Sequence, residues 1–284
     1  LDVLRRSTTW LAERAVDSAR LDAEILVAHA LHLERLQLYL QFDRPLDEAE
    51  LTAIRELIRR RGAHVPVAYL VGEREFFSLP FTVDARVLVP RPETELLVEV
   101  AVEALREVEA PVFADVGTGS GCIAVALLHA QPAAWAHATD VEADALEVAR
   151  ANAERHEVLD RLTLHRGAGL APLAGHAVHG RLDAVLSNPP YILENDPTVE
   201  RGVREHEPHA ALYVEGPDPL AVATRIAEEA VDALAPGGLL ALEVGMGSAT
   251  EARRRLDVLG YEALQVKPDL AGIDRVVTGR RPLT

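Results

Sequence analysis

Four consecutive residues, Asn188-Pro189-Pro190-Tyr191, have the types and order that chemistry on an amino group requires. They follow residues 183–187, an apolar run typical of a buried strand. The two prolines fix φ and remove two N–H donors, so the carbonyl groups at Asn188 and Pro189 need other partners. Asn188 adds a side-chain oxygen as an acceptor, and Tyr191 adds an aromatic face for a planar group. We expect a rigid pair of acceptors directed at an –NH₂ group.

Such acceptors suit transfer of a methyl group to a planar nitrogen. The lone pair of an amide or exocyclic amino nitrogen is delocalised, so the nitrogen must become more pyramidal before it attacks. Two hydrogen bonds from its protons hold it in line and stabilise the positive charge that develops on it. A strong base is unnecessary because the proton can leave late. The alternative interpretation is a plain Pro-Pro loop.

A glycine-rich turn lies upstream, between a strand pattern and a helix pattern. Its glycines allow the backbone to approach a ligand closely, and N–H groups at a helix start suit a carboxylate or phosphate. A dinucleotide fingerprint would need Gly or Ala at the position of Cys122. The pattern D-x-G-x-G-x-G is instead the one that S-adenosylmethionine methyltransferases use, and a tight turn without ligand is the third interpretation. The candidate cofactor-binding residues are Asp115, Gly117, Thr118, Gly119, Ser120 and Gly121.

Asp140 ends the next strand pattern, residues 135–139. An acid at this position can accept both hydroxyl groups of a ribose. It can also cap the helix expected over residues 143–156. If Asp140 binds a nucleoside, Glu142 or Asp144 is expected to take the cap.

The N-terminal part, residues 1–73, has only helical periodicity. Asp47 and Glu50 have the spacing of a capping box, and Gly62 is expected to end the same helix. Residues 75–89 are rich in strand formers and predict a β-hairpin, which Pro90 and Pro92 close. We expect a helical domain over residues 1–73, a β-hairpin linker over 74–92 and an α/β domain over 93–284.

Strand and helix patterns alternate from residue 93 onward, which indicates a doubly wound, mostly parallel sheet with ligands beyond the carboxyl ends of its strands. The expected strands are residues 112–116, 135–139, 162–164, 183–187, 238–244, 261–266 and 275–277. The expected helices are residues 94–108, 123–129, 143–156, 220–234 and 248–259.

Composition limits the possible function classes. The formal net charge of −16 disfavours stable nucleic-acid binding through phosphates but is compatible with a basic protein partner. The single cysteine, Cys122, excludes an intramolecular disulfide and fits a reducing cytosol. No apolar run reaches the ~20 residues of a membrane span. We expect a cytoplasmic monomer without a membrane association.

Several segments beyond these motifs resemble one family. They are residues 72–80, 89–95, 188–192, 205–208 and 274–280, and the similarity extends from about Gly72 to the end. The chain is similar to the release-factor glutamine methyltransferases (PrmC/HemK). The resemblance implies a class I, Rossmann-like methyltransferase with a seven-stranded, mostly parallel sheet and a small helical N-terminal domain.

The resemblance also implies a reaction. The substrate would be the glutamine of the Gly-Gly-Gln loop in class 1 release factors, docked by the helical domain, and S-adenosylmethionine would become S-adenosylhomocysteine without a metal. The residues from Gly117 to Gly121, with Asp115, Asp140 and Asn188, would hold the cofactor. Asn188 and the Pro189 carbonyl would bind the substrate amide. The remaining substrate residues by resemblance are Pro190 and Tyr191, which flank the amide, and Arg91 and Glu93, which shape that side of the cleft.

One segment departs from the family pattern. Ala168 stands where the family usually has an acid near the adenine, so adenine recognition is expected to rest on backbone groups or a neighbouring acid. His206 and His209 are expected in a polar surface loop over the cleft rather than in a metal site. The alternatives are a nucleic-acid amino methyltransferase acting on adenine N6 or guanine N2, a non-catalytic binding module and a dinucleotide oxidoreductase.

Overall fold

The computed structural model describes residues 2–41 and 43–283, which form two compact units. The helical unit contains the residues up to Glu73 together with Thr198–Glu207. The α/β unit contains Arg74–Pro197 and the residues from Pro208 onward. In the described part of the chain, no helix is both long and apolar enough to cross a membrane.

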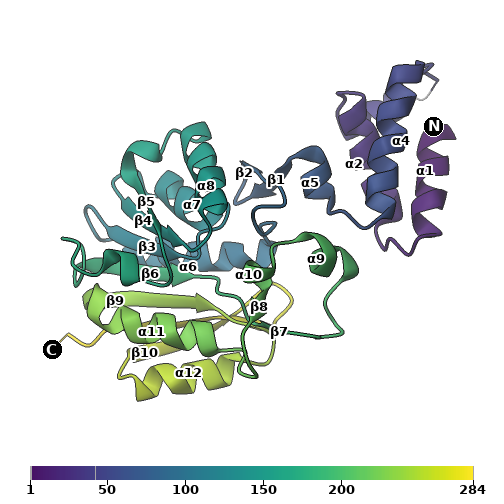
Figure 1. Ribbon diagram of the computed structural model, residues 1–284. Coiled ribbons are helices and arrows are strands. Elements are labelled where there is room, and N and C mark those ends of the chain that lie inside the picture. The colour runs from purple at the N-terminus through teal and green to yellow at the C-terminus, as the bar shows by residue number, and fades with distance from the viewer. Residues whose placement is uncertain (1, 42, 284) are drawn as a thin grey trace. The chain divides into compact units, whose positions relative to one another are not determined.

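The helical unit packs its apolar stripes into one core, and the helices predicted for it are confirmed (Figure 1). Leu11, Leu26 and Ile54 are among its fully buried side chains. Its helices are α1 (Asp2–Ala12), α2 (Ala19–Ala30), α3 (Arg35–Leu40), α4 (Glu48–Gly62), α5 (Val67–Val71) and α9 (Arg201–His206).

Helix α4 begins and ends where its sequence predicts. The Asp47 carboxylate accepts the Glu50 N–H at 2.8 Å, and the Glu50 carboxylate accepts the Asp47 N–H at 3.0 Å, which is the predicted capping box. Gly62 ends the helix as predicted, as its last helical residue. A Cβ atom there would lie 2.2 Å from the Trp10 ring, so glycine makes room for tryptophan. His64 adopts the left-handed conformation, with φ 65°.

The predicted β-hairpin is present but shorter than expected. Strands β1 (Glu73–Phe76) and β2 (Leu79–Thr82) are joined by Phe77 and Ser78, whose φ values of 52° and 60° suit a two-residue hairpin turn. The expectation of strand structure up to residue 89 is wrong. Asp84 accepts the Arg86 N–H at 3.0 Å, and this side-chain bond forms a turn where a strand would continue.

The α/β unit contains the predicted seven-stranded sheet, in the order β10-β11-β9-β6-β3-β4-β5. The five strands from β9 to β5 are parallel, and β11 pairs antiparallel with both β9 and β10. The strands are β3 (Val112–Val116), β4 (Trp135–Asp140), β5 (Leu162–Arg166), β6 (Leu182–Ser187), β9 (Leu234–Glu243), β10 (Glu262–Pro268) and β11 (Asp274–Arg280).

Helices cover both faces of this sheet (Figure 1). One layer contains α6 (Glu95–Leu105), α7 (Cys122–Ala130) and α8 (Ala143–Arg155), and the other contains α11 (Ala221–Ala233) and α12 (Ala249–Val258). The short helices η1 (Pro92–Thr94), η2 (Leu159–Arg161), η3 (Ala171–Leu173) and α10 (His209–Leu212), and the parallel pair β7 (Ile192–Leu193) and β8 (Tyr213–Val214), have no counterpart among the predicted elements.

The strand order reverses beside β3, because β4 lies on one side of it and β6 on the other. Val116 at the end of β3 is in register with Ser187 at the end of β6. The glycine-rich turn and the Asn-Pro-Pro-Tyr segment therefore leave the sheet at the same edge. Ligands of open parallel sheets bind at such a switch point.

Candidate active site

The glycine-rich turn is fixed by backbone hydrogen bonds to β4. The N–H groups of Gly117 and Thr118 both donate to the Thr139 carbonyl, at 2.9 and 3.0 Å. Gly117 and Gly119 have φ values of 73° and 53°, which glycine adopts without strain. A Cβ atom on either would have no heavy atom within 4 Å. The turn therefore presents bare backbone to open space, as a ligand cradle requires.

Asp115 lies beneath this turn and is fully buried. Its Oδ2 accepts the Thr118 hydroxyl at 2.6 Å and the Ala124 N–H at 3.2 Å. Its Oδ1 is buried without a partner among the described residues. Burial raises the pKa of Asp115 to about 7, against the opposing effect of these two hydrogen bonds. A buried acceptor this close to the turn holds the backbone in place.

Asp140 ends β4 and faces the turn. Its Oδ2 accepts the Gly119 N–H at 2.9 Å, and its Oδ1 accepts the Glu142 N–H at 3.0 Å. Burial raises the pKa of Asp140. The carboxylate thus does not cap α8. Glu142 occupies the cap position without a side-chain cap bond, so the expectation of a carboxylate cap from Glu142 is wrong.

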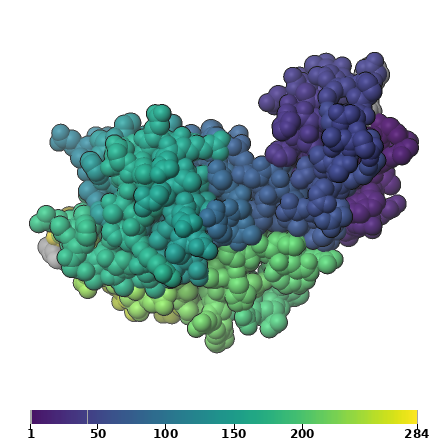
Figure 2. Space-filling model, turned by 45° about the horizontal axis from the view of Figure 1, so that its top comes forward, coloured from purple at the N-terminus to yellow at the C-terminus, as the bar shows by residue number. Residues whose placement is uncertain are grey.

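A cleft of about 710 Å³ opens along this edge of the sheet, a size typical of small-molecule sites. In Figure 2, the green surface that includes residues 208–215 borders the teal surface of the glycine-turn half of the sheet. The cleft lining includes six of the sequence-predicted site residues, namely Gly117, Gly119, Asp140, Asn188, Pro189 and Pro190. It also includes Arg86, Glu142, residues 167–169, residues 208–211 and Arg225, which were not predicted as site residues.

The other predicted residues support this cleft from behind or beside it. Asp115, Thr118 and Ser120 are buried, and Gly121 packs against Ala149. None of these four, nor Tyr191, Arg91 or Glu93, is among the lining residues in the described part of the chain. Arg91 and Glu93 act electrostatically on Tyr191, whose pKa is raised mainly by burial.

Asn188 is held by a hydrogen bond at one end of its amide. Its Nδ2 donates to the Thr94 hydroxyl at 3.1 Å, and Thr94 donates to the buried Glu243 carboxylate at 2.6 Å. Asn188 also lines the cleft. Tyr191 packs on Gly245, where a Cβ atom would lie only 3.0 Å from the ring.

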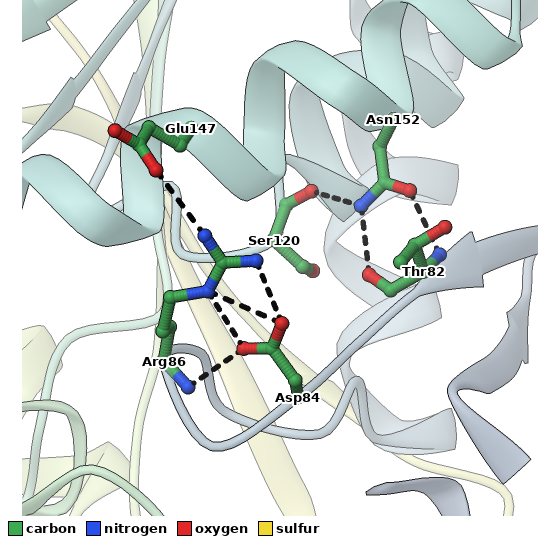
Figure 3. Close-up of polar contacts among 6 residues, drawn as sticks. All are labelled: Thr82, Asp84, Arg86, Ser120, Glu147 and Asn152. Carbon is green, nitrogen blue, oxygen red and sulfur yellow. Dashed lines mark hydrogen bonds and ion pairs between the residues drawn. The ribbon is translucent and has the colours of Figure 1, made fainter.

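Asn152 on α8 connects the hairpin to the glycine turn and was not predicted from the sequence (Figure 3). Its Nδ2 donates to the carbonyl groups of Ser120 at 2.8 Å and Thr82 at 3.0 Å, and its Oδ1 accepts the Thr82 N–H at 2.8 Å. Arg86 binds Asp84 and lies 3.3 Å from Glu147 in the same view. These contacts fix the backbone on which the cleft is built.

The two histidines lie in short helices rather than in the expected loop. His206 is in α9, where its Nε2 lies 2.9 Å from the Ala63 carbonyl. His209 begins α10, lines the cleft and lies 3.2 Å from Glu194. Among the described residues, no group of three or more His, Cys, Asp or Glu side chains is arranged to hold a metal.

The segment around Ala168 gains an acid from another element. Glu229 on α11 accepts the Leu170 N–H at 2.5 Å and lies against Gly169. The carboxylate therefore fixes the backbone at residues 169–170, and residues 167–169 line the cleft. Cys122 is buried and burial raises its thiol pKa to about 12, as expected for a packed rather than reactive thiol.

Two family models match separate parts of the chain. The PrmC N-terminal domain matches residues 2–72, and the methyltransferase small domain matches residues 92–204. The fold is also that of solved methyltransferases. A methyltransferase from Pyrococcus furiosus covers 80% of this chain and 98% of its own, with a TM-score of 0.52 and 20% identity. The hMettl16 catalytic domain, with a TM-score of 0.59 and 15% identity, covers 81% of both chains.

Relatives that align over nearly their whole length are more similar in sequence than these solved structures. The release factor glutamine methyltransferase of Chlorobaculum tepidum is 41% identical over 97% of this chain and 95% of its own. The relative of the same name in Nitratidesulfovibrio vulgaris is 42% identical over 99% and 95%, and that of Deinococcus radiodurans is 39% identical over 99% and 98%. Identity at this level over both domains shows the family. The chain is a member of the release factor glutamine methyltransferases.

Proposed function

We propose that this protein transfers a methyl group from S-adenosylmethionine to the side-chain amide nitrogen of the glutamine in the Gly-Gly-Gln motif of class 1 release factors. The observation that carries the proposal is the position of Asn188, which lines the cleft and whose amide is fixed at Nδ2 by Thr94. The relatives' names indicate the same reaction.

The cleft fits the cofactor. In this proposal Asp140 accepts ribose hydroxyl groups through the lone pairs that remain on its carboxylate oxygens, which also accept the Gly119 and Glu142 N–H groups. Gly117 and Gly119 leave room where side chains would project, and backbone groups of residues 167–169 line the adenine side. Bound S-adenosylmethionine supplies the electrophilic methyl group. Asp115, Thr118, Ser120 and Gly121 act by holding the turn.

Asn188 and Pro189 act on the substrate. The Asn188 Oδ1 and the Pro189 carbonyl accept the two amide protons, which orients the nitrogen lone pair toward the methyl group. The same acceptors stabilise the charge that grows on nitrogen in the transition state. Pro190 makes the segment rigid, and Tyr191, with Arg91 and Glu93 beside it, flanks the amide. The helical unit docks the release factor, and the enzyme acts as a cytoplasmic monomer.

A transfer assay with labelled S-adenosylmethionine tests this proposal. The full chain is incubated with a class 1 release factor, with its Gly-Gly-Gln to Gly-Gly-Ala variant, and with bulk DNA and RNA. We expect label on the unmodified factor alone. Label on nucleic acid and none on the factor would support the amino methyltransferase alternative and overturn the proposed substrate.

A further inference from the structure

Asn188 is the first of three side chains that are linked by hydrogen bonds, and the last of them is a buried carboxylate. Asn188 Nδ2 donates to Thr94 Oγ1 at 3.1 Å, and Thr94 Oγ1 donates to Glu243 Oε2 at 2.6 Å. Asn188 follows β6, Thr94 precedes α6, and Glu243 is the last residue of β9. Thr94 and Glu243 are only 3% and 2% exposed, so water does not compete for these bonds.

The number of available protons determines which group donates and which accepts in these two hydrogen bonds. An ionised carboxylate only accepts, and a threonine hydroxyl has one proton. Because that proton goes to Glu243, the Thr94 oxygen can bind Asn188 only as an acceptor. The Asn188 amide must then present its –NH₂ to Thr94, which turns its carbonyl oxygen toward the cleft.

We propose that Thr94 and Glu243 are positioning residues that select the orientation of the Asn188 amide in which its oxygen faces the substrate. The inference rests on the proposed function and adds to it the means by which Asn188 is oriented. The terminal torsion of asparagine is broad and roughly two-fold. In the flipped orientation Asn188 would point two donors at the substrate –NH₂, which has no suitable acceptor, and the transition state would lose one of its two acceptors.

The hydroxyl group of Thr94 is the part that can be removed cleanly. Thr94→Val keeps the branched shape and removes the hydroxyl, and Thr94→Ser keeps the hydroxyl and removes a methyl group. We expect Thr94→Val to lower kcat about 10- to 100-fold, because a misoriented group of this kind costs that much. The KM for the release factor and the Kd for S-adenosylmethionine should stay within about threefold, because uniform binding is unchanged.

The matched variant decides whether the hydroxyl is responsible. Thr94→Ser is expected to keep kcat within about threefold of the wild type, because it retains the hydroxyl group that orients Asn188. Equal kcat values for Thr94→Val and the wild type would overturn the proposal. So would an equal loss in Thr94→Ser and Thr94→Val. A wild-type enzyme that labels no release factor would instead overturn the proposed function, so the two failures are distinguishable.

Glu243 gives a second, independent measurement that does not depend on the folding of Thr94→Val. Charged groups that act on it are Arg275 from β11 and Arg91 and Glu93 from the segment before α6, and it acts in turn on Tyr191 and Cys122. Burial raises the pKa of Glu243 to about 7. Below that pH the protonated carboxyl can donate to Thr94. The Thr94 hydroxyl is then free to donate to Asn188, and the orientation of the Asn188 amide is no longer fixed.

The pH profile of kcat therefore reports on Glu243. We expect the wild-type kcat to rise as the pH increases through about 7, and we expect Glu243→Gln to lose this rise because its amide does not titrate. Binding of S-adenosylmethionine, measured by calorimetry, should change less than about threefold. The same rise in both proteins, or no rise near this pH in the wild type, would remove Glu243 from the positioning role.

Discussion

The side-chain amide of Asn152 donates a 2.8 Å hydrogen bond to the carbonyl of Ser120, inside the glycine-rich turn. The same amide pairs twice with Thr82 on the hairpin. One buried residue on α8 thus satisfies backbone groups of two segments that approach the cleft (Figure 3). Its contribution is structural, because it orders the turn to which we assign cofactor binding.

Asn152→Ala is expected to weaken both folding and cofactor binding. Three backbone groups lose their partner, and each such loss costs about 1–3 kcal/mol. The unfolding free energy in urea should fall by at least 2 kcal/mol on this order-of-magnitude scale, and the Kd for S-adenosylmethionine should rise. Glu154→Ala, an exposed position on the same helix, is the control. Equal stability of the two variants would contradict the assigned role.

Asn188→Ala should separate chemistry from cofactor binding. The variant loses one of the two acceptors that we propose for the substrate amide, and the loss of one transition-state hydrogen bond costs on the order of 100-fold in kcat. The Kd for S-adenosylmethionine, measured by calorimetry, should stay within about threefold, since the ribose and turn contacts remain. Loss of binding with transfer retained would reverse the role given to Asn188.

The fold was predictable because its elements carry local patterns. Buried parallel strands are short apolar runs, and the helices between them have one apolar stripe. Carboxyl ends of parallel strands meet at one edge, so the glycine turn, Asp140 and Asn188 could be placed together before the strand order was known. The observed order β9-β6-β3-β4-β5 puts them there.

Long-range polar partners were not predictable. Thr94 is 94 residues from Asn188 and 149 residues from Glu243 in the chain, and no local pattern encodes such pairs. Asn152 did leave a signal: it is a polar residue on the buried face of a helix. A buried polar group needs partners, so its position could have marked it. The end of the hairpin was missed because the apolar Val83, Val87 and Val89 are buried without belonging to a strand.

Asp140→Asn should weaken cofactor binding. The substitution replaces the charged acceptor and turns an –NH₂ group toward one of the two backbone N–H groups that Asp140 accepts. Hydrogen bonds to charged groups are worth about 1.5–3 kcal/mol. We expect the Kd for S-adenosylmethionine to rise about 10- to 100-fold on that scale. Glu142→Gln, two residues away in the same cleft lining, is the matched control. A similar loss in both variants would indicate a general charge effect rather than ribose recognition.

Asp115→Asn should change how stability depends on pH. The carboxyl pKa is raised from 3.8 to about 7 by burial, so the folded protein binds this proton more tightly than the unfolded chain does. The stabilisation is therefore complete below pH 3.8 and is lost as the pH rises through about 7. Asparagine does not titrate. The pKa of Glu243 is also raised, but Glu243 is present in both proteins, so its contribution to the pH dependence cancels in the difference.

The difference between the two proteins isolates the contribution of Asp115. Between pH 5 and pH 8 we expect the wild type to lose on the order of 2 kcal/mol of unfolding free energy relative to Asp115→Asn. Urea unfolding of the ligand-free proteins at both pH values provides the comparison. Parallel stability curves would mean that Asp115 is already ionised at pH 5. Its unpartnered Oδ1 would then be a buried negative charge, which the protein could retain only with a compensating donor close to the turn.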